Sequence, residues 1–237
     1  MMGPKKHRHE IKYLLSHAEY LEIKGRISAI LAPDINQAAD GYFIRSIYFD
    51  DLSDKAYWEK VNGVYDRRKY RIRAYNNDPS YIVFESKEKY DKLIAKQSVR
   101  INEHICESLV SCDYAVLEDA ADGILKEFYF AAMQSGMRPV VTVDYMREAF
   151  VYPVSNLRVS FDRHLRVSGL RGFDIAGKSA EDDLSLPIYR HDNVVMEIKY
   201  DDFYPRIIRD IMPQGTGRAQ SISKYCLCRG VVMGLRT

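Results

Sequence analysis

One short segment of the sequence places cations at alternate positions. In residues 66–75, DRRKYRIRAY, the cations Lys69, Arg71 and Arg73 alternate with apolar residues. Because successive side chains of a β-strand point to opposite faces, these three cations would share one face of a strand. Arginine binds phosphate with a fork of donors, and lysine binds it as a point charge. The segment therefore predicts a site for a polyanion.

The same alternation recurs elsewhere in the chain. The charged residues that would share a strand face are Glu10 with Lys12, Glu85 with Lys87, Lys96 with Arg100, Arg158 with Asp162, and Glu197 with Lys199. Two architectures explain this set: a sheet with one solvated face, or a barrel of about eight strands whose interior is the charged face. We favour the barrel, because solvent exposure alone would use more neutral polar residues. Cations crowded in such an interior need carboxylates or a bound polyanion to compensate them.

Carboxylates belong to this pattern as well. Glu10, Glu85 and Glu197 each precede a lysine by two residues, so acid and base would lie side by side on a strand. A carboxylate among phosphate-binding cations suggests a divalent metal that bridges protein and phosphate. An ion pair with the neighbouring lysine explains any single pair equally well. The sequence leaves both interpretations open, and the candidate metal ligands are Glu197 and Glu10.

Strands connected by hairpins must position the residues that carry this chemistry. The predicted strands cover residues 8–15, 41–50, 67–75, 80–89, 93–102, 138–152, 157–168 and 193–201. The predicted helices cover residues 16–31, 52–63, 103–112, 117–135, 203–212 and 217–235. Hairpins imply antiparallel pairing, so we expect an α+β fold, a closed antiparallel β-barrel of about eight strands with helices packed outside. Residues 171–187 are expected to form a mobile loop.

Composition bounds the class of protein. The chain has 237 residues, 46% of them hydrophobic, and a net charge of +2, so a cationic site must come from local sorting of charge. We expect a single domain over residues 1–237. No apolar run approaches the roughly 20 residues of a membrane span, and no signal region follows the basic N-terminus, so a cytoplasmic protein is expected. Nucleic acid is not an expected partner, because a barrel interior admits a thin chain rather than a duplex.

Six segments, in this order, resemble the VTC domain, the polyphosphate polymerase domain of the vacuolar transporter chaperone complex. They are HEIKY (9–13), SIYFDD (46–51), RKYRIRAY (68–75), FESKEK (84–89), LRVSFD (157–162) and VVMEIKYD (194–201). That domain belongs to the CYTH-like, or triphosphate tunnel metalloenzyme, superfamily. The resemblance implies a closed β-tunnel that binds triphosphates or polyphosphate together with Mn²⁺ or Mg²⁺. It also implies an enzyme that transfers the γ-phosphate of ATP to a growing inorganic polyphosphate chain.

The resemblance assigns roles to particular residues. It implies five catalytic residues that hold the reacting phosphates: Arg71, Arg73, Lys87, Arg147 and Arg158. The substrate-binding residues would be Lys12, Lys199 and Lys224 from the resemblance, and Lys69, Lys96 and Arg100 from the strand pattern. Glu197 would be the metal-ligating glutamate. Phosphoryl transfer depends mostly on positioning and charge neutralisation, so no nucleophilic side chain is required.

Two departures from the family pattern bear on function. The hydrolase branch of the superfamily begins with E-x-E-x-K, whereas Arg8 stands in place of the first glutamate here. The loss of one acid favours the polymerase over a two-metal hydrolase. The eukaryotic polymerase is tied to membrane helices that take up its product, and none are expected here, so a membrane or other partner protein would handle the product. A triphosphate or nucleoside triphosphate hydrolase and a non-catalytic polyphosphate-binding module are the alternatives.

Overall fold

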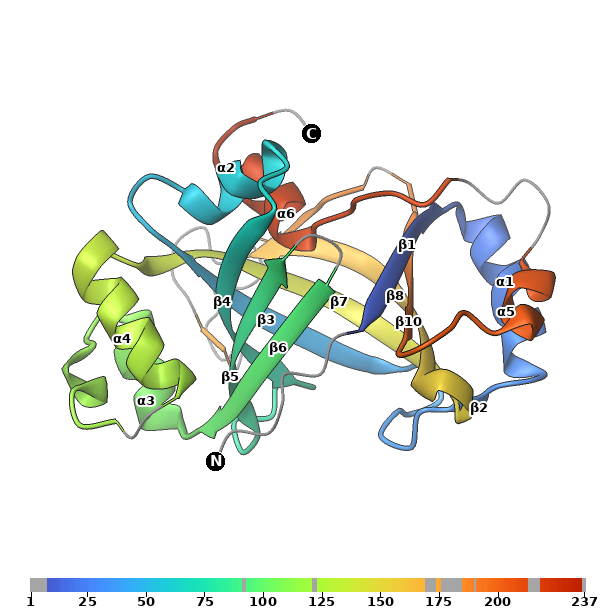
Figure 1. Ribbon diagram of the computed structural model, residues 1–237, viewed down its shortest axis with the longest axis horizontal. Helices are drawn as coiled ribbons and strands as arrows, with labels where there is room; N and C mark the ends of the chain where they lie inside the picture. Colours follow the sequence, from blue (N-terminus) through green and yellow to red (C-terminus); the bar gives the residue numbers. More distant parts are fainter. Residues whose placement is uncertain are drawn as a thin grey trace.

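An antiparallel β-sheet spans the middle of the molecule (Figure 1). The structure is a computed structural model that describes residues 8–90, 93–120, 123–168, 174–175, 185–189, 191–212 and 218–235. Its strands are β1 (His9–Leu15), β2 (Ala32–Pro33), β3 (Tyr42–Asp50), β4 (Asp66–Tyr75), β5 (Ile82–Tyr90), β6 (Leu93–Ile101), β7 (Arg138–Tyr152), β8 (Leu157–Ser168), β9 (Leu186–Pro187) and β10 (Val194–Tyr200). The predicted α+β class is confirmed.

The eight long strands follow one path, in the order β1-β10-β8-β7-β3-β4-β5-β6, with antiparallel neighbours throughout. The strands at the two ends of this path are β1 and β6. Among the described residues, the only backbone bridge between the two ends of this path joins Arg8, just before β1, to Ile94 of β6. The expectation of a barrel closed by hydrogen bonds is therefore corrected. Side chains span the rest of this opening, where Lys87 of β5 reaches Glu10 of β1 at 2.9 Å.

Helices lie around the sheet in pairs (Figure 1). The described α-helices are α1 (His17–Ser28), α2 (Lys55–Val61), α3 (Glu103–Val110), α4 (Ile124–Ser135), α5 (Arg206–Ile211) and α6 (Lys224–Val232). One buried apolar cluster joins α3 and α4 to the sheet, a second joins α1 and α5, and a third joins α2 and α6. Ser16 and Glu19 form the predicted capping box of α1. Among the described residues, no helix has both the length and the apolar character needed to cross a bilayer.

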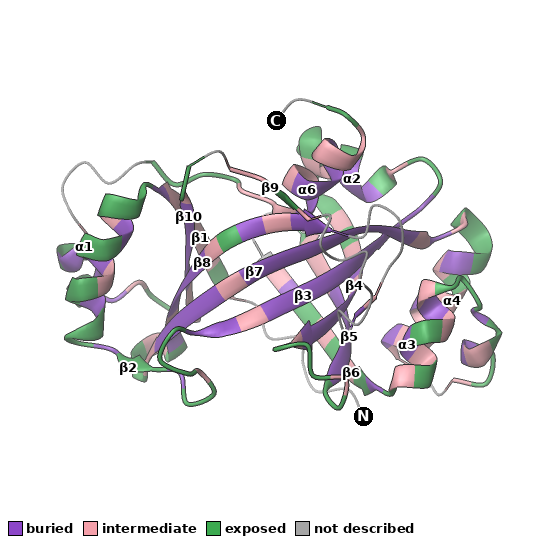
Figure 2. Ribbon diagram, turned by 180° about the vertical axis from the view of Figure 1, so that it is seen from behind, coloured by how far each residue is buried: buried purple, intermediate pink, exposed green. Residues whose placement is uncertain are grey.

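The two faces of the sheet differ in chemistry. On the outer face, Ile72 and Ile198 are fully buried in the apolar clusters beneath the helices. On the inner face, Arg73, Glu85 and Glu197 are only 5%, 2% and 4% exposed. Figure 2 shows how far burial extends along the central strands β3 and β7. The alternative architecture, a sheet with one solvated face, does not describe this fold. In that architecture the charged side chains would lie in water, whereas these three are buried.

Three segments differ from the sequence prediction. The predicted helix 117–135 begins only at Ile124, after Gly123 in a left-handed conformation at φ 132°. The predicted helix 217–235 begins only at Lys224, and residues 218–223 before it have no regular secondary structure. The predicted mobile loop 171–187 lies mostly outside the described residues, although its last two residues form β9 and pair with β8.

Candidate functional site

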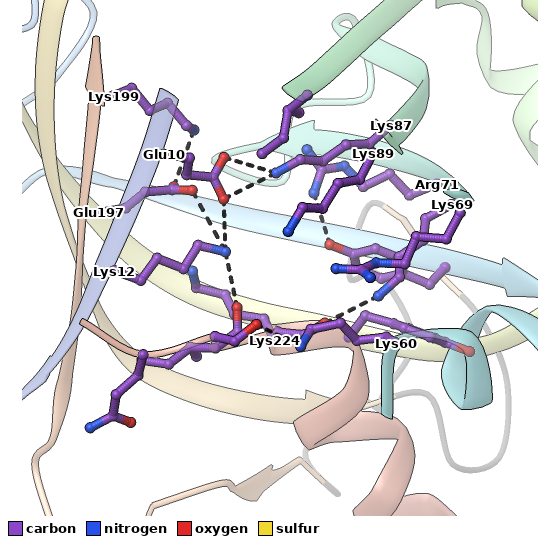
Figure 3. Close-up of a pocket in the computed structure, with 18 of the residues that line it drawn as sticks. Glu10, Lys12, Lys60, Lys69, Arg71, Lys87, Lys89, Glu197, Lys199 and Lys224 are labelled. Atoms are coloured by element: carbon purple, nitrogen blue, oxygen red, sulfur yellow. Dashed lines mark hydrogen bonds and ion pairs between the residues drawn. The ribbon is translucent and has the colours of Figure 1, made fainter. Parts of the chain in front are cut away.

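The charged inner face borders a cavity of about 210 Å³ (Figure 3). Side chains reach it from strands on both sides of the sheet opening, from α2 and from the start of α6. Its cationic lining residues are Lys12, Lys60, Arg67, Lys69, Arg71, Arg73, Lys87, Lys89, Arg147, Lys199 and Lys224. Among the described lining residues, the only carboxylates are Glu10 and Glu197. Eleven cations against two carboxylates give the cavity a positive potential that attracts anions.

The two carboxylates lie side by side on β1 and β10 (Figure 3). The strand register places Lys12 opposite Glu197 and Glu10 opposite Lys199. Lys12 Nζ lies 2.9 Å from Glu10 Oε1 and 3.7 Å from Glu197 Oε1. Lys199 Nζ lies 3.1 Å from Glu197, and Lys87 Nζ lies 2.9 Å from Glu10. The two E-x-K segments thus join with Lys87 in one network of two acids and three bases.

Both carboxylates stay ionised despite their burial. Burial would raise the pKa of Glu197, but Lys199 and Lys12 outweigh it and hold that pKa well below its usual range. Burial and the neighbouring Glu197 would likewise raise the pKa of Glu10, but Lys12 and Lys87 outweigh them and lower it. The cavity therefore offers two anionic oxygen donors among its cations.

The chemistry of these two carboxylates fits a divalent metal that further oxygen ligands would complete. Magnesium is commonly bound through one or two carboxylates together with substrate phosphates, and manganese also suits oxygen ligands. Glu10 and Glu197 supply that donor set. Within the described ranges, no group of three or more His, Cys, Asp or Glu side chains could hold a metal ion. A metal held here would therefore need phosphate oxygens or water to complete its coordination.

Two arginines of β4 point into the cavity from the face that the alternation predicts. Arg71 Nε donates to Glu85 Oε2 at 2.6 Å. Arg73 donates to the hydroxyls of Ser46 and Tyr145, each at 3.0 Å. A carboxylate thus neutralises the first guanidinium, whereas neutral hydroxyls orient the second. Arg73 therefore interacts with Glu85 through space rather than through a hydrogen bond, and its guanidinium faces the cavity.

Arg147 of β7 and Lys224 of α6 share one buried carboxylate. Arg147 binds Asp162 with both branches of its guanidinium, at 2.6 and 2.7 Å, and Lys224 Nζ lies 2.5 Å from the same carboxylate. Arg147 Nη2 also lies 3.5 Å from Glu197 Oε2. Burial would raise the pKa of Asp162, but Arg147 and Lys224 hold it at about 2. Asp162 was not predicted as a site residue, and it holds two predicted phosphate ligands beside the carboxylate pair.

Three lining cations were not among the predicted site residues. Arg67 and Lys89 lie directly opposite each other on β4 and β5. They continue the alternating rows of Lys69 and Lys87, so the strand pattern contains the signal that could have found them. Lys60 comes from α2. A strand pattern carries no information about a helix that covers one side of the sheet.

Ten of the thirteen predicted site residues line the cavity, and Lys96, Arg100 and Arg158 do not. Arg158 Nη1 binds Asp34 at 2.8 Å, and Lys96 forms an ion pair with Glu85. Arg100 is exposed and donates to a backbone carbonyl. Alternation fixes the face on which a side chain lies but not its position along the strand, so it could not separate these three residues from the ten that line the cavity.

The family of the chain follows from its sequence profile. The profile of the VTC domain family matches residues 7–233, which is nearly the whole chain. This chain belongs to the VTC domain family, as its segments predicted. A comparison with curated proteins gives no match.

Several solved structures align with most of the chain. The PH1819 protein of Pyrococcus horikoshii is 11% identical, with 93% of this chain and 97% of that chain covered and a TM-score of 0.47. A candidate adenylate cyclase of Bacillus halodurans is 16% identical, with 89% and 87% covered and a TM-score of 0.47. The Mimivirus capping enzyme triphosphatase is 12% identical, with 88% and 91% covered and a TM-score of 0.40. With TM-scores below 0.5, these structures add nothing to the family assignment.

Proposed function

We propose that this protein is a metal-dependent polyphosphate polymerase, which transfers the γ-phosphate of ATP to a growing inorganic polyphosphate chain. The observation that carries the proposal is the meeting of eleven cations and two ionised carboxylates in one cavity. The excess of cations suits a polyanion, and the carboxylate pair suits a metal bound together with phosphate. Membership of the VTC domain family supports a substrate of this class.

The reaction needs positioning and charge neutralisation rather than a nucleophilic side chain. A terminal oxygen of the polyphosphate attacks the γ-phosphorus of ATP, the bond from that phosphorus to the β,γ-bridging oxygen breaks, and ADP leaves. Arg71, Arg73 and Arg147 would hold the reacting phosphates in line and spread the charge that develops on them.

Glu10 and Glu197 would hold Mn²⁺ or Mg²⁺, which neutralises phosphate charge when it is bound. Lys12 and Lys199 already contact these carboxylates, so they would bind phosphate oxygens close to the metal. Lys87, which contacts Glu10 from the other side of the sheet opening, would do the same. The carboxylate pair would thus gather the metal and three lysines at one place, and phosphate charge would be neutralised most strongly there.

Incubation of the purified protein with ATP and Mn²⁺ tests this function, with the products resolved on a gel stained for polyphosphate. A polyphosphate ladder that grows with time is the expected result. Release of inorganic phosphate without polymer would instead identify a hydrolase on the same fold. Tight binding of polyphosphate with no turnover of ATP would identify a binding module. Either of these outcomes would overturn the proposal.

A further inference from the structure

The amine of Lys69 and the thiol of Cys226 lie in contact at one side of the cavity. Lys69 Nζ, from β4, donates to Cys226 Sγ at 3.7 Å and to Ser223 Oγ at 3.2 Å. Its ammonium group also lies 4.7 Å from the centre of the Tyr225 ring. These three partners are the N-cap of α6 and two residues of its first turn. The end of the lysine side chain is therefore held against the start of this helix.

Ser223 positions the thiol as well as the amine. Its hydroxyl, which caps α6, accepts from the backbone N–H of Cys226 at 3.4 Å. The same oxygen accepts from Lys69, so one side chain contacts both members of the pair. Two reactive groups that are far apart in the sequence are thus kept together, and rotation of the lysine side chain is enough to bring its nitrogen onto the sulfur.

Both groups have the chemistry that a covalent bond between them requires. Burial, the largest cause, lowers the pKa of Lys69 to about 8, so about a tenth of its amine is neutral and nucleophilic at pH 7. A lysine in water has a pKa of about 10.4, and its neutral fraction at pH 7 is below about one in a thousand. Cys226 is half-buried, at a helix N-terminus and beside a lysine, which is a setting in which protein thiols are commonly oxidised.

The other three cysteines have no amine among their described contacts. Cys106 and Cys228 are buried, and burial raises the pKa of Cys106 to about 12. Cys228 Sγ donates to a backbone carbonyl at 3.8 Å. Cys112 is exposed and interacts with Tyr114. Oxidation therefore bears on a lining residue of the cavity at Cys226, and Cys112 is a suitable control.

We propose that Lys69 and Cys226 form a redox-sensitive crosslink, a sulfenamide between Nζ and Sγ. Hydrogen peroxide first oxidises the thiol to a sulfenic acid and is itself reduced to water. The neutral amine then attacks the sulfur, so that an N–S bond forms, the S–O bond breaks, and a proton of the amine leaves with the hydroxyl group as a second water. The protein loses two hydrogens in all, and an excess of a small thiol reverses the reaction by reducing the N–S bond to amine and thiol.

The crosslink removes a cation from the cavity. Lys69 lines the cavity in the reduced protein (Figure 3). A sulfenamide nitrogen carries no positive charge at neutral pH, so an anion in the cavity loses one charged hydrogen bond, which is about tenfold in affinity. The crosslink itself needs no assumption about the reaction, whereas its effect on activity rests on the proposed function.

Mass spectrometry of the protein after treatment with hydrogen peroxide and digestion without a reductant tests the crosslink. The expected product is a pair of joined peptides, which contain Lys69 and Cys226, are lighter than the separate peptides by two hydrogens, and come apart in dithiothreitol. Lys69→Arg and Cys226→Ser should each abolish this product, and Cys112→Ser should retain it. A Cys226 that stays a free thiol, or that reaches sulfinic acid beside an unmodified Lys69, would overturn the crosslink.

Calorimetry with tripolyphosphate, without metal or ATP, tests the consequence. The oxidised wild type is expected to bind about tenfold less tightly than the reduced protein, and dithiothreitol should restore the affinity. Cys226→Ser should bind as the reduced wild type does, before and after peroxide, whereas Cys112→Ser should lose affinity on oxidation as the wild type does. An affinity that oxidation leaves unchanged, or a loss that persists in Cys226→Ser, would overturn the switch. Neither measurement needs turnover, so a crosslink found without polymer synthesis would contradict the polymerase and leave this inference standing.

Discussion

Arg71 Nε lies 2.6 Å from Oε2 of Glu85, a carboxylate that is only 2% exposed. Burial would raise the pKa of Glu85, but Arg71 and Arg73 outweigh it and hold that pKa far below its usual range. A carboxyl group with a lowered folded-state pKa stabilises the fold above its unfolded pKa of about 4, and this stability is lost as the pH falls below that value. Arg71 is therefore both a candidate phosphate ligand and the partner of a buried charge.

Arg71→Ala is expected to lower the free energy of unfolding by about 2–3 kcal/mol, because the buried Glu85 loses a charged hydrogen bond and keeps the more exposed Lys96 as its ion-pair partner. The double variant Arg71→Ala, Glu85→Gln should recover most of that loss but should not recover polyphosphate binding. Arg73→Ala should cost only about 1–2 kcal/mol, since Arg73 donates to two neutral hydroxyls. Urea denaturation at pH 7 measures all three changes, and an Arg71→Ala protein as stable as the wild type would contradict this assignment.

The strand alternation explains why so much of the inner face could be predicted. It placed Lys69, Arg71 and Arg73 on one face, and all three line the cavity. It could not give the position of the cavity along the strands, so it included Lys96 and Arg100, which do not line the cavity. Position along a strand depends on the register with neighbouring strands and on the helices that cover the sheet, and neither follows from a period of two.

Lys60 and the segment that precedes α6 were hidden from the sequence for a related reason. Lys60 belongs to α2, and its ammonium group reaches the cavity only because α2 and α6 pack together beside the sheet. Ser221 and Ser223 have no distinctive chemistry as residue types, and only the folded structure shows that Lys60 and Lys69 donate to their hydroxyls. Tertiary contacts of this kind leave no periodic signal in one chain.

Glu197→Gln tests the metal assignment, because it keeps the shape of the side chain and removes its charge. Metal-dependent turnover is expected to fall by about two orders of magnitude or more, since the carboxylate is one of the two protein ligands that fit a metal. Binding of polyphosphate without metal should persist or become tighter, because an anion has left the cavity. Glu22→Gln, at an exposed position of α1, is the control and should behave as the wild type. Full activity of Glu197→Gln with Mn²⁺ would refute the assignment.

Anion affinity should fall as the pH rises through about 8. Burial lowers the pKa of both Lys69 and Lys199 to about 8, so each ammonium loses its charge near that pH. A bound anion stabilises the protonated form, and binding at pH 8 should therefore take up protons. Calorimetry with long-chain polyphosphate in two buffers of different ionisation enthalpy measures this uptake. Lys69→Gln should reduce it, and binding that is independent of pH between 7 and 9 would contradict the lowered pKa values.

The same lysines predict the opposite trend for stability without a ligand. A lysine whose folded-state pKa is lowered destabilises the fold while it is protonated, and that cost disappears as the pH rises from about 8 toward its unfolded pKa of about 10.4. The stability of the wild type relative to Lys69→Gln should therefore rise between pH 8 and pH 10. Thermal unfolding of the two proteins across this range provides the comparison, and a constant difference would argue against it.

Gly41 holds the backbone beside Arg147 in a way that no other residue allows. Its φ is +88°, and an added Cβ would lie 2.2 Å from the carbonyl oxygen of Arg147. Gly41→Ala is expected to lower the free energy of unfolding by about 3 kcal/mol or more, from backbone strain and steric overlap. Gly25→Ala, in α1 with nothing within 4 Å, should instead stabilise the protein by about 0.5–1 kcal/mol. Equal effects of the two substitutions in thermal unfolding would show that the close approach at Arg147 is absent.

The central claim is that the cavity moves the γ-phosphate of ATP onto polyphosphate, and label transfer tests it most directly. The protein is incubated with Mn²⁺, a short polyphosphate primer and ATP labelled either at the γ- or at the α-phosphate, and the polymer is then isolated. The account predicts that γ-label enters the polymer with one ADP formed for each phosphate added, that α-label stays out of it, and that Glu197→Gln abolishes the transfer. Label that appears only as inorganic phosphate, or ATP that remains unconsumed beside bound primer, would contradict it.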